Sequence, residues 1–123
     1  MNEEMMKYIE YVVDDLGLPK HLKGYKDTIY CIDEKVLDEN AKLTYIYFKV
    51  AKRLGVTGPS IERNIRHTVE WLYRNGDTRK MNKYFGSSMP RRNNLTNNQF
   101  IATLSMAAIR AKREVDLYAN YRR

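Results

Sequence analysis

The chain has few of the residues that staple a small protein or carry common enzyme chemistry. Its 123 residues include three prolines, two histidines and a single cysteine, Cys31. One cysteine excludes an intrachain disulfide and fits a reducing compartment, and we expect Cys31 to be a small packed or half-exposed residue rather than a reactive thiol. His21 and His67 have no second histidine or cysteine at the i, i+3 or i, i+4 spacing of a metal site. We expect no metal, no cofactor and a core that is stable without a disulfide or a structural metal.

Long apolar runs are missing too. No run approaches the roughly 20 residues that span a bilayer, and the first residues, MNEEMMKYIEYVVDD, are acidic where a signal peptide is basic. We therefore expect a cytoplasmic protein with no membrane contact. Glycine-rich phosphate loops, the G-x-S-x-G elbow and kinase signatures are absent. Glu62 and Glu70 lie too far apart on one helix to act as a catalytic pair, so we expect that the chain is not an enzyme.

Charge is divided unevenly along the chain. Residues 1–48 carry six Lys and Arg against ten Asp and Glu, a net charge of −4. Residues 49–83 have a net charge of +6 and residues 84–123 of +5, which gives the formal +7 of the whole chain. A basic half beside an acidic half indicates a polyanionic partner met by one face. The alternative is surface charge that serves only solubility.

Apolar residues recur at helical spacing, and no stretch alternates as a strand does. We predict an all-α fold, a compact six-helix domain over residues 1–123 with no internal repeat or linker. The expected helices are 5–15, a second within 21–40, 44–54, 58–75, 78–85, and a last one from 97 almost to the end of the chain.

Capping and turn residues predict the helix boundaries. Gly17 ends the first helix, and Thr96 with Gln99 forms a capping box before the last. Residues 86–95 are predicted to form a loop in which Arg91 and Arg92 are either a DNA-backbone arm or solvated. The other expected signals are a Thr44 cap on the third helix, Thr57 or Gly58 on the fourth, and an αL stop at Asn75-Gly76. The last helix should place six apolar residues on one face, which we expect to pack within the chain, with a dimer contact as the alternative: Phe100, Leu104, Ala108, Ala111, Val115 and Tyr118.

The helices 44–54 and 58–75 have the features of a helix-turn-helix. Such a unit needs a small residue in its first helix, a residue that tolerates positive φ in the turn, and apolar residues after it. Ala51, Gly55, Val56 and Ile61 occupy those places. A further apolar anchor is expected at position 64, where the chain has Asn64.

The polar side of the helix 58–75 has the residue types that read DNA. Arginine binds guanine O6 and N7 through two hydrogen bonds, and a carboxylate accepts from cytosine N4. We predict that Ser60, Glu62 and Arg63 read bases. The alternative is a solvated face with the i, i+4 ion pairs Glu62–Arg66 and Glu70–Arg74. The predicted contacts to the DNA backbone are Lys49, Lys52, Arg53, Thr57, Arg66, His67 and Arg74.

In their order, five segments resemble the C-terminal effector domain of the master response regulator that starts sporulation in endospore-forming Firmicutes. They are LGLPKHLKGY (16–25), VAKRLGVT (50–57), IERNIRH-VE (61–70), YFG (84–86) and TNNQFIA (96–102). The resemblance runs from about Leu16 to about Val115 and implies a six-helix fold. It also implies base reading by Glu62 and Arg63 and backbone contact by Arg66 and His67.

The chain departs from that family in three ways. Ser60 stands where the family has an arginine, which would cost about 1–3 kcal/mol of discrimination at one base pair. Asn64 replaces a small apolar residue. Only residues 1–15 precede the resemblance, and they look like an extra helix rather than a receiver domain, so control by phosphorylation is not expected. That helix is a candidate for dimerisation or partner binding.

These features predict a sequence-specific transcriptional regulator that binds double-stranded DNA in the major groove as dimers or tandem copies. RNA polymerase or a sigma factor is a further candidate partner. The alternative is an interaction module, derived from a DNA-binding domain, that acts on another regulator or on polymerase.

Overall fold

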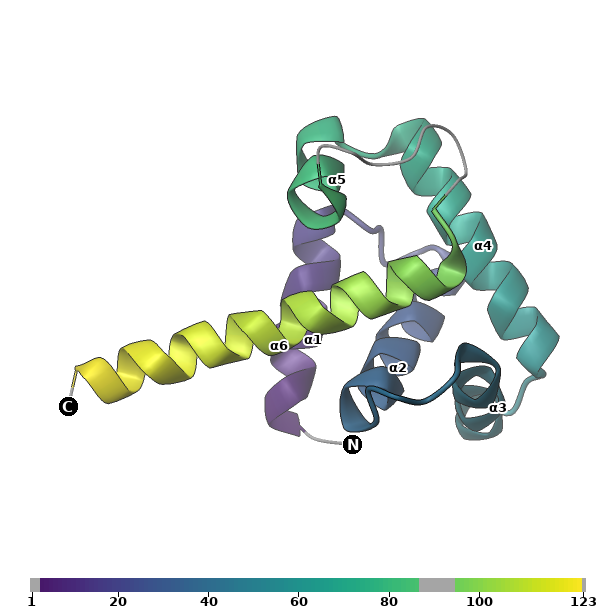
Figure 1. Cartoon of the computed structure of the whole chain (residues 1–123). Helices are drawn as coiled ribbons and strands as arrows, with labels where there is room; N and C mark the ends of the chain where they lie inside the picture. Colours follow the sequence, from purple (N-terminus) through teal and green to yellow (C-terminus); the bar gives the residue numbers. More distant parts are fainter. Residues whose placement is uncertain (1–2, 87–94, 123) are drawn as a thin grey trace.

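The computed structural model describes residues 3–86 and 95–122, and the helices within them agree with the predicted number and class. No strand occurs in these two ranges. Arg91 and Arg92, the suggested backbone arm, lie outside the described residues. In chain order the helices are α1 (Glu3–Leu16), α2 (Lys23–Leu37), α3 (Leu43–Leu54), α4 (Gly58–Asn75), α5 (Thr78–Phe85) and α6 (Asn97–Tyr121) (Figure 1).

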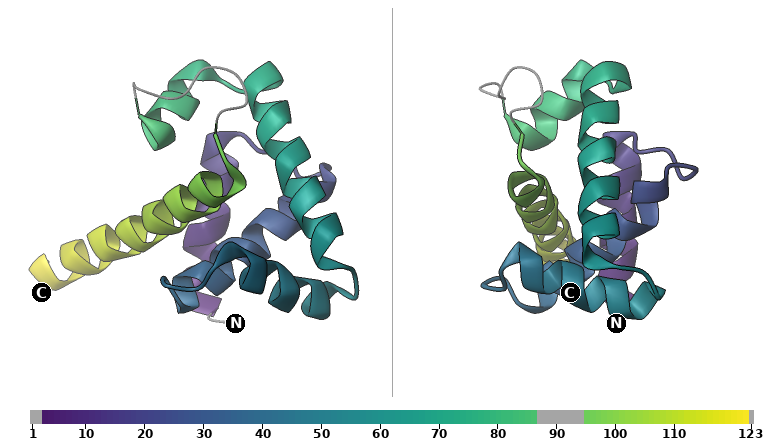
Figure 2. Two further views of the ribbon diagram at one scale, coloured as in Figure 1. Left: turned by 45° about the vertical axis from the view of Figure 1, so that its right-hand side comes forward. Right: turned by 90° about the vertical axis from the view of Figure 1, so that its right-hand side faces the viewer.

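α1 is part of the core. Its apolar stripe is buried, with Ile9 and Val13 at 0% exposure, and it packs against both α2 and α6 (Figure 2). Gly17 ends the helix at φ 96°, as predicted. The apolar stripe of this helix, a candidate for dimerisation or partner binding, is therefore covered within the chain.

The first half of α6 closes the core from the other side. Phe100, Leu104 and Ala108 are fully buried, and the Phe100 ring stacks on Phe85 with 6.0 Å between centroids. The predicted capping box is present, because Thr96 Oγ1 accepts from the Gln99 N–H while Gln99 Oε1 accepts from the Thr96 N–H. Cys31 is also buried in the core, where burial raises the pKa of its thiol, as expected of a packed residue.

The second half of α6 corrects a prediction. Val115 and Tyr118 were expected to pack within the chain, yet they are 51% and 63% exposed. The reason is geometric, because a helix of 25 residues is about 37 Å long and outruns the helices beneath it. Figure 1 shows this half projecting away from α3 and α4.

Two of the predicted boundary signals were wrong. α3 begins at Leu43 with Lys42 as its N-cap and no side-chain cap, so Thr44 lies inside the first turn. Gly76 has φ −74° and is not an αL stop. Its role is close approach, since a Cβ there would lie 2.5 Å from the Leu72 carbonyl oxygen.

α2 crosses α4 at a glycine. A Cβ on Gly24 would lie 1.9 Å from Thr68 Oγ1 and 2.6 Å from the Asn64 carbonyl oxygen. Since one of these atoms is backbone, a rotamer change cannot make room. Gly24 therefore sets the distance between α2 and α4.

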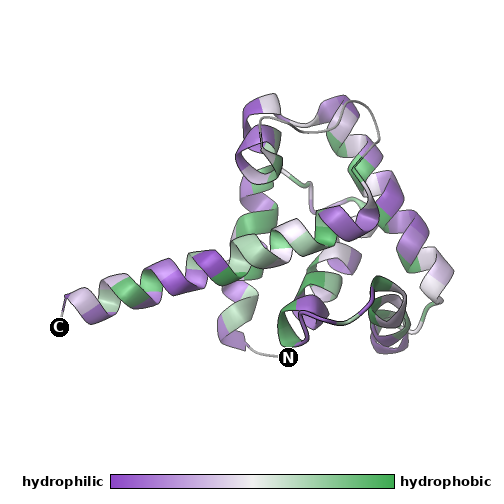
Figure 3. Ribbon diagram, viewed as in Figure 1, coloured by the Kyte–Doolittle hydropathy of each residue, from purple (hydrophilic) through white to green (hydrophobic). Residues whose placement is uncertain are grey.

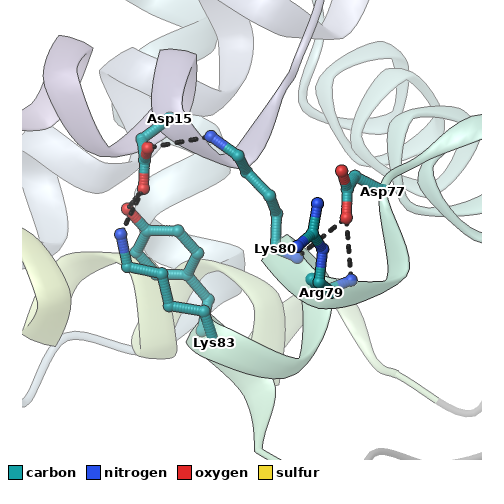
Figure 4. Close-up of polar contacts among 6 residues, drawn as sticks. Asp15, Asp77, Arg79, Lys80 and Lys83 are labelled. Carbon is teal, nitrogen blue, oxygen red and sulfur yellow. Dashed lines mark hydrogen bonds and ion pairs between the residues drawn. The ribbon is translucent and has the colours of Figure 1, made fainter.

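α5 is fastened to the end of α1 by a single carboxylate. Asp15 accepts from Lys83 Nζ at 2.7 Å, from Lys80 Nζ at 3.1 Å and from the Tyr84 hydroxyl (Figure 4). The hydrogen bond from Lys83, followed by that from Tyr84, holds the pKa of Asp15 well below its ordinary value. Asp77 caps the same helix by accepting from the Arg79 and Lys80 N–H groups.

None of the helices in the described ranges combines the length and apolar character needed to cross a membrane.

Candidate nucleic-acid interface

The turn between α3 and α4 has the predicted backbone conformation. Gly55 lies in the αL region at φ 69°, and no atom lies within 4 Å of where its Cβ would stand. Positive φ is thus the only reason for glycine here. The Val56 N–H then donates to the Ala51 carbonyl at 3.0 Å, which closes the end of α3. Ala51 and Ile61, the predicted small residue and anchor, are both buried, whereas Val56, the other predicted apolar residue, is 48% exposed.

α4 is anchored along one face and held at two further points. Its predicted stripe of Ile61, Ile65, Val69 and Leu72 is at most 1% exposed. Asn64 donates from Nδ2 to Asp27 on α2 at 2.8 Å, which explains the polar residue where an apolar anchor was expected. Ile65 takes over the packing role of that anchor.

The second point is Asn97, in the first turn of α6. Its Nδ2 donates to the backbone carbonyl of Glu62 and to the hydroxyl of Tyr47 on α3, both at 3.1 Å. Burial raises the pKa of Tyr47 to about 12, so this hydroxyl stays protonated. Asn97 therefore ties the first turns of α4 to α3. Sequence reasoning missed it, because an asparagine after a cap residue gives no sign of its distant partners.

The face of α4 opposite this stripe is exposed and bears most of the predicted DNA contacts. Among the residues that the structure describes, none of their charged side chains forms an ion pair. The i, i+4 pairs Glu62–Arg66 and Glu70–Arg74 of the alternative interpretation are therefore not formed. The exposed residues are Glu62, Arg63, Arg66, His67 and Arg74.

Ser60 and Thr57 are engaged with each other at the start of α4. Thr57 is the N-cap and accepts from the Ser60 N–H at 3.2 Å, while the Ser60 hydroxyl donates to the Thr57 carbonyl at 2.9 Å. With its proton committed, Ser60 Oγ has only lone pairs left to present to a base.

The predicted backbone contacts on α3 divide into two kinds. Arg53 binds Asp33 at 3.2 Å and Glu34 at 3.1 Å, and Lys49 binds Glu34 at 3.0 Å, so both are held to α2. The hydrogen bond to Glu34 raises the pKa of Lys49. Lys52 is exposed, makes no ion pair in the described ranges, and lies 5.6 Å from the Phe48 ring centroid.

One cation outside the predicted set lies beside α4. Lys23, in the first turn of α2, lines a depression together with His67, Arg74 and Glu70. Lys23 lies in the acidic half of the chain, so a comparison of net charge between segments did not single it out.

The model of the family "Sporulation initiation factor Spo0A C terminal" matches residues 9–108. The chain belongs to this family. Its members are the DNA-binding effector domains of sporulation transcription regulators, so the resemblance found in the sequence is confirmed. The match begins inside α1, before the expected Leu16, and ends at Ala108, short of the expected Val115.

The matched region contains the helix-turn-helix and every residue predicted to contact DNA. The family is one of DNA-binding regulators rather than of enzymes. No group of three or more potential metal ligands occurs among the described residues.

Proposed function

We propose that the chain binds double-stranded DNA in a sequence-specific manner, with α4 in the major groove, as paired or tandem copies that regulate transcription. The observation that carries the proposal is the exposed face of α4, where Glu62, Arg63, Arg66, His67 and Arg74 have no ion-pair partners among the described residues. Three of the five are arginines, the residue type that binds phosphates and the edge of guanine.

The base readers in this proposal are Glu62 and Arg63, in the first turns of α4. These turns of a recognition helix reach deepest into the groove. Asn97 holds the Glu62 backbone, so the readers stand on a helix that is fixed on both sides of the turn. Such fixation lowers the ordering cost of binding.

Ser60 gives the site a different preference from relatives that have arginine there. While its proton is donated to the Thr57 carbonyl, its oxygen can accept from cytosine N4 or adenine N6, and it lacks the pair of donors with which arginine binds guanine O6 and N7. We propose that the base pair under Ser60 is read weakly or differently, while the pairs under Glu62 and Arg63 keep the family's reading.

The backbone contacts in this proposal are Thr57 at the N-cap of α4, Arg66, His67 and Arg74 on α4, Lys52 on α3 and Lys23 on α2. Lys49 and Arg53 add to the positive electrostatic potential of this face but make no direct contact with DNA, because their side chains are already bound to α2 carboxylates. RNA polymerase or a sigma factor remains a proposed further partner, following the family.

Replacing Arg63 by alanine should weaken binding to the best duplex selected from random sequences by about 10-fold or more, the equivalent of a lost bidentate base contact. Binding to a shuffled duplex should change only by the loss of one positive charge. Arg66→Ala should instead weaken binding to both duplexes by the same factor and reduce the slope of log affinity against log salt by about one. Fluorescence anisotropy titrations measure both.

The control is Arg113→Ala, which removes the same charge from the projecting half of α6. It should leave the ratio of the two affinities unchanged. If Arg63→Ala also leaves that ratio unchanged, α4 does not read bases through Arg63. Absence of binding to any duplex would favour the interaction module instead.

A further inference from the structure

We propose that the projecting half of α6 pairs, antiparallel, with the same segment of a second copy of this chain. This pairing would be the contact between the two copies in the paired DNA binding proposed above, and its role rests on that proposal. Its existence can be tested without DNA. The segment lies beyond residue 108, outside the part of the chain that matches the family.

The apolar seam of α6 continues past the core without a partner. Its residues are spaced by four and three, the period of a coiled-coil seam. Leu104 and Ala108 are buried in the core, and Ala111 is partly buried. Val115 and Tyr118 follow at 51% and 63% exposure. Figure 3 shows hydrophobic residues recurring along this half of the helix.

This exposed seam forms one wall of a groove. The groove has a volume of about 540 Å³ and lies between α6 and α1. Tyr8 and Tyr11 line it from α1, and Tyr11 is 58% exposed. One further apolar side chain, Tyr121 at 87% exposure, flanks the seam on the same helix. Each copy thus has a groove between α1 and α6 and, on α6, apolar side chains that can fill the groove of a second copy.

A second copy fits this surface because, in an antiparallel two-fold pairing, every contact between the copies occurs twice. In the seam register, Val115 of one copy packs on Tyr118 of the other, and the symmetric contact repeats it. The Tyr121 of the second copy then lies on the α1 side of the seam, where Tyr11 is exposed.

Charge supports the same register. Arg122 of the second copy lies over small Ala111, with its guanidinium beside Glu114, which is one turn further along the same face. Within the described residues neither Glu114 nor Arg122 forms an ion pair, and Arg122 only contacts the Tyr118 ring, at 5.8 Å. Each copy therefore supplies one free acid and one free base, and the pairing joins them in two equivalent ion pairs.

The arrangement leaves the DNA-binding face uncovered. α6 projects on the side away from α3 and α4 (Figure 1), so two copies joined there keep both α4 helices exposed. DNA and the second copy would occupy opposite ends of each molecule.

Sedimentation equilibrium of the full chain without DNA, over a wide range of concentrations, tests the pairing. We expect a reversible monomer–dimer equilibrium whose dissociation constant rises about 30-fold or more in Tyr118→Glu, which puts two charges into the apolar seam. Arg113→Glu, a charge change outside the seam, should leave the constant within about threefold. Circular dichroism should show equal helix content in each variant.

A charge-swap cycle tests the register. Glu114→Arg and Arg122→Glu should each weaken the dimer about 10-fold, and the double variant should restore it to within about threefold. A chain that is monomeric at all concentrations, or a double variant that is weaker than either single one, would overturn the proposal. Because no DNA is present, neither result bears on whether α4 reads bases.

Discussion

Arg53→Met should destabilise the fold by about 3 kcal/mol, the lower end of the range for breaking a buried ion pair. The Asp33 side chain is 1% exposed and Glu34 is 8% exposed, so removing Arg53 leaves two buried carboxylates with less compensation. The lower end applies because the Arg53 side chain is itself 29% exposed. Methionine preserves the length of the stem, so the loss reports mainly charge and hydrogen bonds. Urea unfolding followed by circular dichroism measures it.

The matched control is Lys52→Met, the same kind of change one residue earlier. Lys52 is exposed and makes no ion pair in the described part of the chain, so its loss should change the free energy of unfolding by less than about 0.5 kcal/mol. Its effect should appear in DNA binding, as a smaller salt dependence. Equal stability of the Arg53 and Lys52 variants would show that Arg53 is not a structural residue.

Gly24→Ala should destabilise the fold by about 2 kcal/mol, the scale of overpacking in a tight core. Helix propensity alone predicts the opposite sign, because alanine is favoured over glycine by about 1 kcal/mol in a helix interior. The structure decides the sign, since the new Cβ would stand 2.6 Å from the Asn64 carbonyl oxygen. To make room, α4 must move away from α2, which also strains the bond from Asn64 to Asp27. Thermal and urea unfolding measure the change.

Gly58→Ala is the control for that experiment. Gly58 is also helical, but the nearest atom to its added Cβ is Tyr47 Cβ at 3.9 Å, an ordinary contact. This variant should unfold at the same denaturant concentration as the parent or at a slightly higher one. If Gly24→Ala were also neutral, α2 and α4 would not be held at the spacing described.

The number and class of the helices were predictable because they depend on local signals. α5 begins and ends where the sequence placed it, between the Asp77 cap and Gly86. The capping box at Thr96 and the positive φ of Gly55 were likewise visible as short motifs. Each of these signals involves residues that are only a few positions apart in the chain, so it can be recognised in the sequence.

What the sequence could not provide were the partners that lie far along the chain. Lys49 and Arg53 looked like free cations on an outer face, but their partners are Asp33 and Glu34 of α2. The periodicity of α6 showed that Val115 and Tyr118 share a face with buried residues. It could not show that the core ends before that face does.

Binding to a duplex with the family's operator box and to a shuffled duplex, each at two salt concentrations, tests most directly whether α4 reads DNA. We predict tighter binding to the box at both salt concentrations, with both affinities falling steeply as salt rises. The margin should be smaller than for a relative with arginine in place of Ser60, because one base reader is missing. Equal affinity for the two duplexes would contradict base reading inherited through Glu62 and Arg63.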